Sequence, residues 1–247
     1  KANGGTTSSN TSGTTTSTVQ ANTTAGFSIV TYAGNSASKT VGHGLSSAPE
    51  WIIVKSRTDN ERWAVFHTSI SNQYIYLNDT FAGETSNADE RFGNSSSVVV
   101  PTDTLVTLGA NNSDVNENGD NYVMYCFHSV EGYSRFGSYT GDGLTTGAGP
   151  FVFLGFRPQW LLIKRTDSSA GWILWDNKRS TFNPTDDYLV PSVYNVEDTN
   201  DNAQKVDLLS NGFKIKNTAT SSSINASGGT YIYMAFAEQP FKFSNAR

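Results

Sequence analysis

The chain has 247 residues and a net charge of −5. An acidic chain of this kind excludes nucleic acid as the main partner, because phosphate contacts require a basic face. No apolar run approaches the ~20 residues that a membrane-spanning helix needs, which excludes insertion into a membrane by a helix. Hydrophobic residues make up 36% and charged residues 16% of the chain, with 12% aromatic residues, and this balance favours an all-β protein whose exposed positions are neutral and polar.

Residues 1–25 form the first segment and consist mainly of Ser, Thr, Gly and Asn. The only sizeable apolar residue is Val19, so the segment buries too little surface to offset its ordering entropy. We predict a flexible leader over 1–25. Because the chain starts without Met, we expect this leader to connect to a natural region upstream of Lys1; the alternative is an artificial linker.

Signals for short strands begin at Gly26. Apolar or alternating runs bounded by turn residues predict strands at 27–32, 41–45, 51–55, 63–67, 74–77, 98–100, 104–108 and 122–130. No window of comparable length has the period of an amphipathic helix. Seven or eight short strands in about 107 residues match the strand number and the length of one β-sandwich.

The central strand of this unit occurs twice in the chain, as PEWIIVK at 49–55 and PQWLLIK at 158–164. The offset is 158 − 49 = 109 residues, and Trp63 and Trp172 have the same offset, 172 − 63 = 109. A constant offset indicates an internal repeat. We predict two homologous jelly-roll-like β-sandwiches, 26–131 and 132–247, with the repeated Trp residues as core anchors. Only Glu131-Gly132 separates the last predicted strand of the first copy from the first strand-like stretch of the second. We therefore expect the two copies to pack directly against each other.

Catalytic chemistry is not indicated. His43, His67 and His128 are scattered, and none has a Cys, Asp or His at the spacing of a metal or catalytic site. A glycosidase needs two carboxylates that face one cleft, whereas the acidic residues lie in separate loops. Cys126 lies in an apolar strand and is expected to be a small buried hydrophobe. We predict a binding protein rather than an enzyme, without a required cofactor.

One loop matches the first half of a calcium-binding loop. Asp114, Asn116, Asn118 and Asp120 alternate along the chain, so their oxygens could converge on one ion while Gly119 supplies the turn. The closing acidic residue is missing, because the twelfth position is a Tyr. Asn-Gly-Asp between two strands is also an ordinary hairpin turn. The sequence favours the turn, with a calcium site as the alternative.

Aromatic residues in regions that differ between the copies are candidates for a ligand surface. A sugar presents an apolar face and a rim of hydroxyls, so an exposed ring beside amides and carboxylates suits it. Trp175 is the strongest candidate, because its counterpart is Phe66 and a polar run follows it; the alternative is a core position, since Trp175 alternates with Ile173. The residues predicted to contact a ligand are Trp175, Asp176, Asn177, Arg179, Tyr194, Phe81 and Phe92.

Three segments carry a family resemblance: AGFSIVTY at 25–32, GSYTG at 137–141 and YMAFAEQPFKFSNAR at 233–247. From about Gly26 to Arg247 the chain resembles a duplicated domain at the C-terminal ends of bacteriophage tail-fibre and other virion-surface proteins. The resemblance implies a place on the virion exterior and a natural C-terminus at Arg247. It also implies attachment to a host cell-surface glycan or envelope receptor, but no particular binding residue.

The same resemblance implies partners within the virion. These are an upstream fibre region or other virion proteins, and fibres of this kind are commonly homotrimers, although this sequence has no coiled-coil segment to impose a trimer. We therefore expect a virion-surface adhesin. The alternative is a structural decoration or assembly protein of the virion that binds no receptor.

Overall fold

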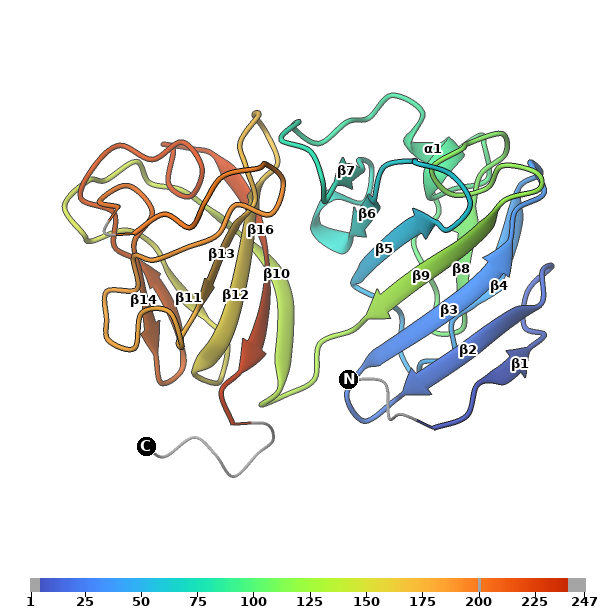
Figure 1. The fold of residues 1–247 in the computed structure, drawn as a ribbon, viewed down its shortest axis with the longest axis horizontal. Coiled ribbons are helices and arrows are strands. Elements are labelled where there is room, and N and C mark those ends of the chain that lie inside the picture. The colour runs from blue at the N-terminus through green and yellow to red at the C-terminus, as the bar shows by residue number, and fades with distance from the viewer. Residues whose placement is uncertain (1–4, 200, 240–247) are drawn as a thin grey trace. The chain divides into compact units, whose positions relative to one another are not determined.

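The computed structural model describes residues 5–199 and 201–239 (Figure 1). In this part the regular secondary structure is almost entirely β-strand, as the prediction of an all-β chain requires, with the short helices η1 (Thr68–Ile70) and α1 (Ala88–Arg91). Neither of these helices could cross a membrane. The chain divides into two compact units. Unit 1 runs to Leu77 and from Gly83 to Ser129, and unit 2 contains Asn78–Ala82 and the chain from Val130 onwards.

Unit 1 is built on a seven-stranded antiparallel sheet in the order β1-β2-β3-β9-β5-β6-β7. Its core lies between one face of this sheet and a separate pair of strands: Ile52 and Phe66 from the sheet share a cluster with Val41 and Val106 from the pair. The sheet strands are β1 (Ser8–Asn10), β2 (Ser17–Asn22), β3 (Phe27–Ala33), β5 (Trp51–Ser56), β6 (Ala64–His67), β7 (Ile75–Tyr76) and β9 (Asn121–Phe127), and the pair is β4 (Lys39–Gly42) and β8 (Leu105–Leu108). The strand predicted at 98–100 is absent, since Val98 forms only an isolated bridge with Gly93.

The prediction of a flexible leader is wrong for residues 5–25, because β1 and β2 extend the sheet. β2 pairs with β3 from Thr18↔Thr31 to Asn22↔Phe27, and Val19 is only 3% exposed. Thr14 and Thr40 also exchange hydrogen bonds, each backbone N–H donating to the other's Oγ1 at 2.9 Å. A polar segment can thus be ordered by main-chain pairing to an existing sheet edge. Residues 1–4 of the predicted leader lie outside the described residues.

Unit 2 has a four-stranded sheet in the order β10-β16-β12-β13 and a three-stranded sheet in the order β11-β15-β14. Its core lies between them, with Leu161, Ile163 and Trp175 from one sheet in the same cluster as Phe213 and Ile215 from the other. The strands are β10 (Ser134–Thr140), β11 (Phe151–Phe153), β12 (Pro158–Arg165), β13 (Ile173–Asp176), β14 (Val206–Leu209), β15 (Gly212–Ile215) and β16 (Thr230–Ala237).

The central strands of the two units have the same register. In unit 1 Trp51 lies opposite Phe127 in the β5–β9 pair. In unit 2 Trp160 lies opposite Phe236 in the β12–β16 pair. The register is offset by 109 residues on both strands, because 160 − 51 and 236 − 127 are equal. The repeated sequence therefore forms the same strand pairing twice.

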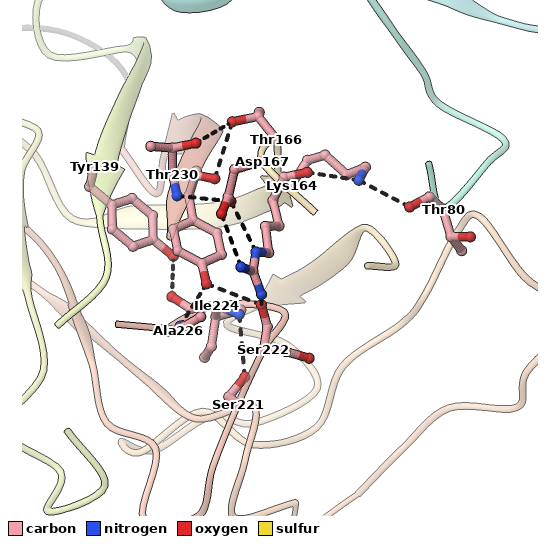
Figure 2. Close-up of polar contacts among 12 residues, drawn as sticks. Thr80, Tyr139, Lys164, Thr166, Asp167, Ser221, Ser222, Ile224, Ala226 and Thr230 are labelled. Atoms are coloured by element: carbon pink, nitrogen blue, oxygen red, sulfur yellow. Dashed lines mark hydrogen bonds and ion pairs between the residues drawn. The ribbon is translucent and has the colours of Figure 1, made fainter. Parts of the chain in front are cut away.

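A tyrosine pair anchors one loop of unit 2 (Figure 2). The rings of Tyr139 and Tyr231 stack with centroids 4.9 Å apart. The Tyr139 hydroxyl donates to the Ile224 carbonyl at 2.8 Å, and the Tyr231 hydroxyl donates to the Ser222 carbonyl at 3.1 Å and accepts from the Ala226 N–H at 2.7 Å. Burial raises the pKa of Tyr139 well above its ordinary value, which keeps the phenol protonated as a donor.

The corresponding tyrosines of unit 1 make the same contacts. Tyr32 and Tyr122 stack with centroids 5.4 Å apart. The Tyr32 hydroxyl donates to the Val115 carbonyl at 2.8 Å, and the Tyr122 hydroxyl donates to the Ser113 carbonyl at 2.9 Å and accepts from the Glu117 N–H at 2.8 Å. Each unit thus fixes the loop before its last strand through two phenols.

The repeated Trp residues share strand positions but differ in burial. Trp51 and Trp172 are fully buried, whereas their counterparts Trp160 and Trp63 are partly exposed. The expectation that both Trp pairs anchor two similar cores is therefore wrong. Strand register is set by main-chain pairing, while the exposure of each ring depends on the loops around it.

Candidate functional site

Trp175 and Phe92, two of the predicted ligand contacts, are core residues. The Trp175 side chain is 0% exposed, its Nε1 donates to the Gln204 carbonyl at 3.0 Å and its ring packs against Tyr188. Phe92 is 2% exposed and packs against Phe66, the counterpart of Trp175, with centroids 5.5 Å apart. A ligand cannot reach either ring, so the core alternative for Trp175 is correct.

Asp114 and Asn116, from the predicted calcium loop, are used inside the protein. The Asp114 carboxylate accepts from the Tyr76 hydroxyl at 2.7 Å and pairs with the Arg91 guanidinium at 2.8 Å. The Asn116 side-chain amide donates to two backbone carbonyls, at 2.6 and 2.7 Å. The Asp114 charge is balanced by Arg91, and the Asn116 amide is used within the fold.

The second half of that loop is a turn, as the sequence favours, but it is not the turn of a hairpin, because β8 pairs with β4 whereas β9 pairs with β3 and β5. Gly119 has φ +94°, and the Asp120 N–H bonds back to the Glu117 carbonyl at 3.3 Å. Asn118 is exposed, whereas Asp120 is buried beside the Tyr122 hydroxyl at 3.3 Å. Across residues 5–199 and 201–239, no group of three His, Cys, Asp or Glu side chains is arranged to hold a metal ion.

Two of the other candidates, Asp176 and Arg179, come together in a groove of unit 2 with a volume of about 710 Å³. β12 contributes the first two lining residues, β13 ends at Asp176, and the remaining residues lie in the loops between β13 and β14. The lining residues are Gln159, Trp160, Asp176, Lys178, Arg179, Asp187, Glu197 and Thr199. We refer to this feature as the unit 2 groove.

Trp160 supplies the aromatic ring of the unit 2 groove. It lies opposite Asp176 in the β12–β13 pair, and its ring is partly exposed and tilted against Phe236 at a centroid distance of 5.7 Å. Its indole N–H makes no hydrogen bond with the described residues. Sequence reasoning took this Trp for a core residue because it is repeated. Strand alternation puts Trp160 on the side opposite Leu161 and Ile163, but only the packing shows that those two residues face the core.

An ion cluster fixes the edge of the unit 2 groove. The Asp176 Oδ1 accepts from the N–H groups of Lys178 and Arg179 at 2.8 and 2.9 Å, and its Oδ2 lies 2.9 Å from the Arg179 Nε. The Arg179 Nη1 lies 2.6 Å from the Glu197 Oε1. The hydrogen bond with Glu197 and the neighbouring Asp176 charge raise the pKa of Arg179 above its ordinary value. Arg179 thus ties the loop that contains Glu197 to the end of β13.

The other predicted contacts lie outside the lining of the unit 2 groove. Asn177 is 7% exposed, and its amide donates to Glu238 at 2.9 Å. Tyr194 is fully exposed in the loop before Glu197, and Phe81 is 45% exposed. Tyr194 and Phe81 remain accessible to a ligand, whereas the Asn177 side chain is buried and bonds to Glu238 within unit 2.

The corresponding position of unit 1 is closed. Trp51 lies opposite His67 in the β5–β6 pair, and the two rings meet edge to face with centroids 5.2 Å apart. The His67 Nδ1 accepts from the Ser69 N–H at 2.9 Å, which caps η1. Burial lowers the pKa of His67 to about 4, so the ring is neutral at physiological pH. Unit 1 thus has a buried neutral pair where unit 2 has a partly exposed Trp and a carboxylate.

Comparison with known proteins gave one match. The model of a domain of unknown function, DUF7483, matches residues 1–240. No curated protein and no solved structure matches the chain. Evidence about function therefore comes from the geometry of the chain itself.

Proposed function

The chain belongs to the DUF7483 family, and from this starting point we propose that it is a virion-surface adhesin whose unit 2 groove binds a glycan of the host cell surface. The observation that carries this proposal is the partly exposed Trp160 ring in a groove lined by three carboxylates, one amide and two cations. Glycan sites combine an aromatic face with hydrogen-bonding side chains in this way.

Five of the lining residues have a stated role in this proposal. The Trp160 face packs against the C–H face of a sugar ring, and its unused indole N–H donates to a hydroxyl. Asp187 and Gln159 bond to further hydroxyls. The hydrogen bonds that hold Asp176 and Arg179 fix the shape of the groove before a ligand arrives, which reduces the entropy lost on binding.

We also propose that the units are two copies of one jelly-roll-like β-sandwich, with the groove as a specialisation of the second copy. The shared register around Trp51 and Trp160 supports the duplication, as do the matching bonds of Tyr32 and Tyr139 to loop carbonyls. The exchange of His67 for Asp176 at one register position supports the specialisation.

The bacteriophage context is also a proposal. It is supported by the resemblance of 25–32, 137–141 and 233–247 to virion-surface proteins, although 240–247 and the expected C-terminus at Arg247 lie outside the described residues. An adhesin carried in several copies, on a homotrimeric fibre or by other virion proteins, gains avidity. Individual sites as weak as millimolar would then suffice, in keeping with an open groove rather than a deep pocket.

A second candidate function is a decoration or assembly protein that contacts only other virion proteins. One observation favours it: Phe151 and Phe153 on the edge strand β11 are 47% and 56% exposed. Their side chains point to the same side of the strand. Adjacent exposed rings on a sheet edge are typical of surfaces that bind another protein.

Adsorption to host cells separates the two functions. Purified chain is incubated with cells, and bound protein is measured as a function of its concentration. The adhesin predicts saturable binding that Trp160→Ala abolishes and Phe153→Ala leaves intact. Retention only on other virion proteins, lost in Phe153→Ala, would establish the assembly function instead. Thermal unfolding of both variants controls for loss of fold.

A further inference from the structure

We infer that the unit 2 groove selects a neutral, hydroxyl-rich glycan over an acidic one. This inference rests on the proposed glycan-binding function and adds the class of sugar. It is carried by three observations: the charges of the lining residues, the pairing of Arg179 with two carboxylates of the protein, and the position of Trp160.

The charges in the groove sum to a negative value. Asp176, Asp187 and Glu197 contribute −3, and Lys178 and Arg179 contribute +2, which gives −1. A carboxylate or sulfate on a sugar would therefore enter a groove of its own sign. Like-charge contact reduces both the affinity and the rate of encounter with acidic glycans.

The guanidinium that would normally bind an acidic sugar is already used. Arginine recognises a carboxylate through two parallel N–H···O bonds from its fork of donors. In this groove the Arg179 Nη1 lies 2.6 Å from Glu197 and its Nε lies 2.9 Å from Asp176. An acidic glycan would have to displace a carboxylate that is already in place, so it gains little from Arg179.

Lys178 does not reverse this balance. Its side chain is exposed, and it makes no ion pair with the described residues. A solvated lysine of this kind contributes little to binding, because water and salt screen it. Asp187, which is partly exposed and also lacks an ion pair among those residues, offsets the Lys178 charge at the same groove.

The remaining groups suit sugar hydroxyls. The Asp187 carboxylate accepts hydrogen bonds, the Gln159 side chain donates and accepts, and the Thr199 hydroxyl does both. The Trp160 ring supplies the apolar face. A neutral hexose chain has both features and brings no charge into the groove.

The test is titration of the full chain with two panels of oligosaccharide probes. Binding is detected by tryptophan fluorescence and by calorimetry. The neutral panel contains gluco-, manno- and galacto-oligosaccharides, and the acidic panel contains uronic-acid and sialylated oligosaccharides of equal length. We expect at least one neutral probe to bind about tenfold or more tightly than every acidic probe, which corresponds to ~1.4 kcal/mol. Raising NaCl from about 50 to about 500 mM should change that affinity less than twofold, because no ion pair forms.

Two variants sharpen the result. Trp160→Ala should weaken neutral binding by about tenfold or more, while Phe153→Ala, an exposed ring outside the groove, serves as the control. Glu197→Gln frees Arg179 from one partner and brings the formal charge of the groove from −1 to 0. It should improve binding of acidic probes relative to neutral ones.

Three results would overturn the inference: tighter binding of an acidic probe, equal binding of both panels, or binding of neither. The host-cell assay then decides separately on the proposed function. If adsorption still depends on Trp160, the groove is a receptor site for another class of ligand. If adsorption is also absent, the adhesin function itself is wrong.

Discussion

Trp160 lies directly opposite Asp176 in the β12–β13 pair, at the register position that Trp51 and His67 occupy in the β5–β6 pair. The backbone pairing is the same in both units, but the side chains give opposite results. His67 is uncharged and buried against Trp51. Asp176 is only partly buried and pairs with Arg179, because a charged carboxylate is costly to bury unless it keeps solvent or a partner. The difference between His67 and Asp176 in the same strand pairing thus accompanies the difference between a buried position in unit 1 and a groove in unit 2.

The first prediction concerns the two tryptophans of unit 2. Trp175→Ala should lower the free energy of unfolding by about 3–5 kcal/mol, because it leaves a cavity in the core. Trp160→Ala should lower it by about 1 kcal/mol or less, since its ring is already partly solvated. Urea denaturation of both variants measures the difference. Equal losses would mean that Trp160 is also a core residue.

The second prediction concerns the Arg91–Asp114 ion pair, whose side chains are 12% and 7% exposed. Removing either partner leaves the other charge buried without its counterion, so Arg91→Ala and Asp114→Ala should each cost about 3–5 kcal/mol. The double variant should lose less than the sum of the two, which a double-mutant cycle measures. Additive losses would show that the two side chains do not depend on each other.

The third prediction follows from the same pair. Asp114 is already neutralised by Arg91, so calcium at about 1 mM should leave the melting temperature unchanged, because only a ligand of the folded state raises it. Differential scanning fluorimetry with calcium and then with a chelator provides the measurement. A rise with calcium that Asp114→Asn abolishes would restore the calcium alternative.

The fourth prediction concerns the pH dependence due to Lys164, which is 0% exposed and donates to the Arg165 carbonyl at 2.8 Å and the Thr80 carbonyl at 3.4 Å (Figure 2). Burial lowers its pKa from 10.5 to about 8. Between these values the unfolded chain binds more protons than the folded chain, so the free energy of unfolding should rise with pH. The rise due to this group should be at most about 3 kcal/mol.

The measurement is urea denaturation from pH 7 to about pH 9, where the tyrosines of the unfolded chain, whose pKa is about 10, are still protonated. Lys164→Met should flatten the rise. Burial also lowers the pKa of Lys39 to about 8. Lys39 therefore adds to the rise in stability with pH, and Lys39→Met should remove the slope that remains in Lys164→Met. The control is Lys55→Met, at the position that corresponds to Lys164, because the Lys55 ammonium bonds the Asp59 carbonyl at the surface. An unchanged slope in Lys164→Met would show that its ammonium remains charged inside the fold.

The fifth prediction concerns β1 and β2. Deletion of residues 1–22 should lower the free energy of unfolding by about 2 kcal/mol or more, because it removes the buried Val19 and exposes the edge of β3. Deletion of residues 1–4, which precede both strands, is the matched control. Equal stability of both truncated chains would show that β1 and β2 contribute nothing to the unit.

The sequence by itself determined that the chain is all-β, and it predicted the positions of most strands and the shared register of the central pair. These features are local. Turn residues bound each strand, short apolar runs mark it, and the 109-residue offset between 49–55 and 158–164 is visible without any structure. Asp176 and Arg179 were also named as candidates from the sequence, because they directly follow Trp175, although Trp175 itself is a core residue.

Only the tertiary structure decided which face of each strand is the core. The run Trp160-Leu161-Leu162-Ile163 is apolar on both faces, so alternation defines two sides without saying which one meets the other sheet. The packing buries Trp175 opposite Leu161 and leaves Trp160 accessible. Likewise, residues 8–10 and 17–22 form strands through hydrogen bonds to a sheet that composition does not reveal. Burial and edge pairing depend on contacts between segments far apart in the chain. For that reason only the folded chain shows which side chains line the candidate groove.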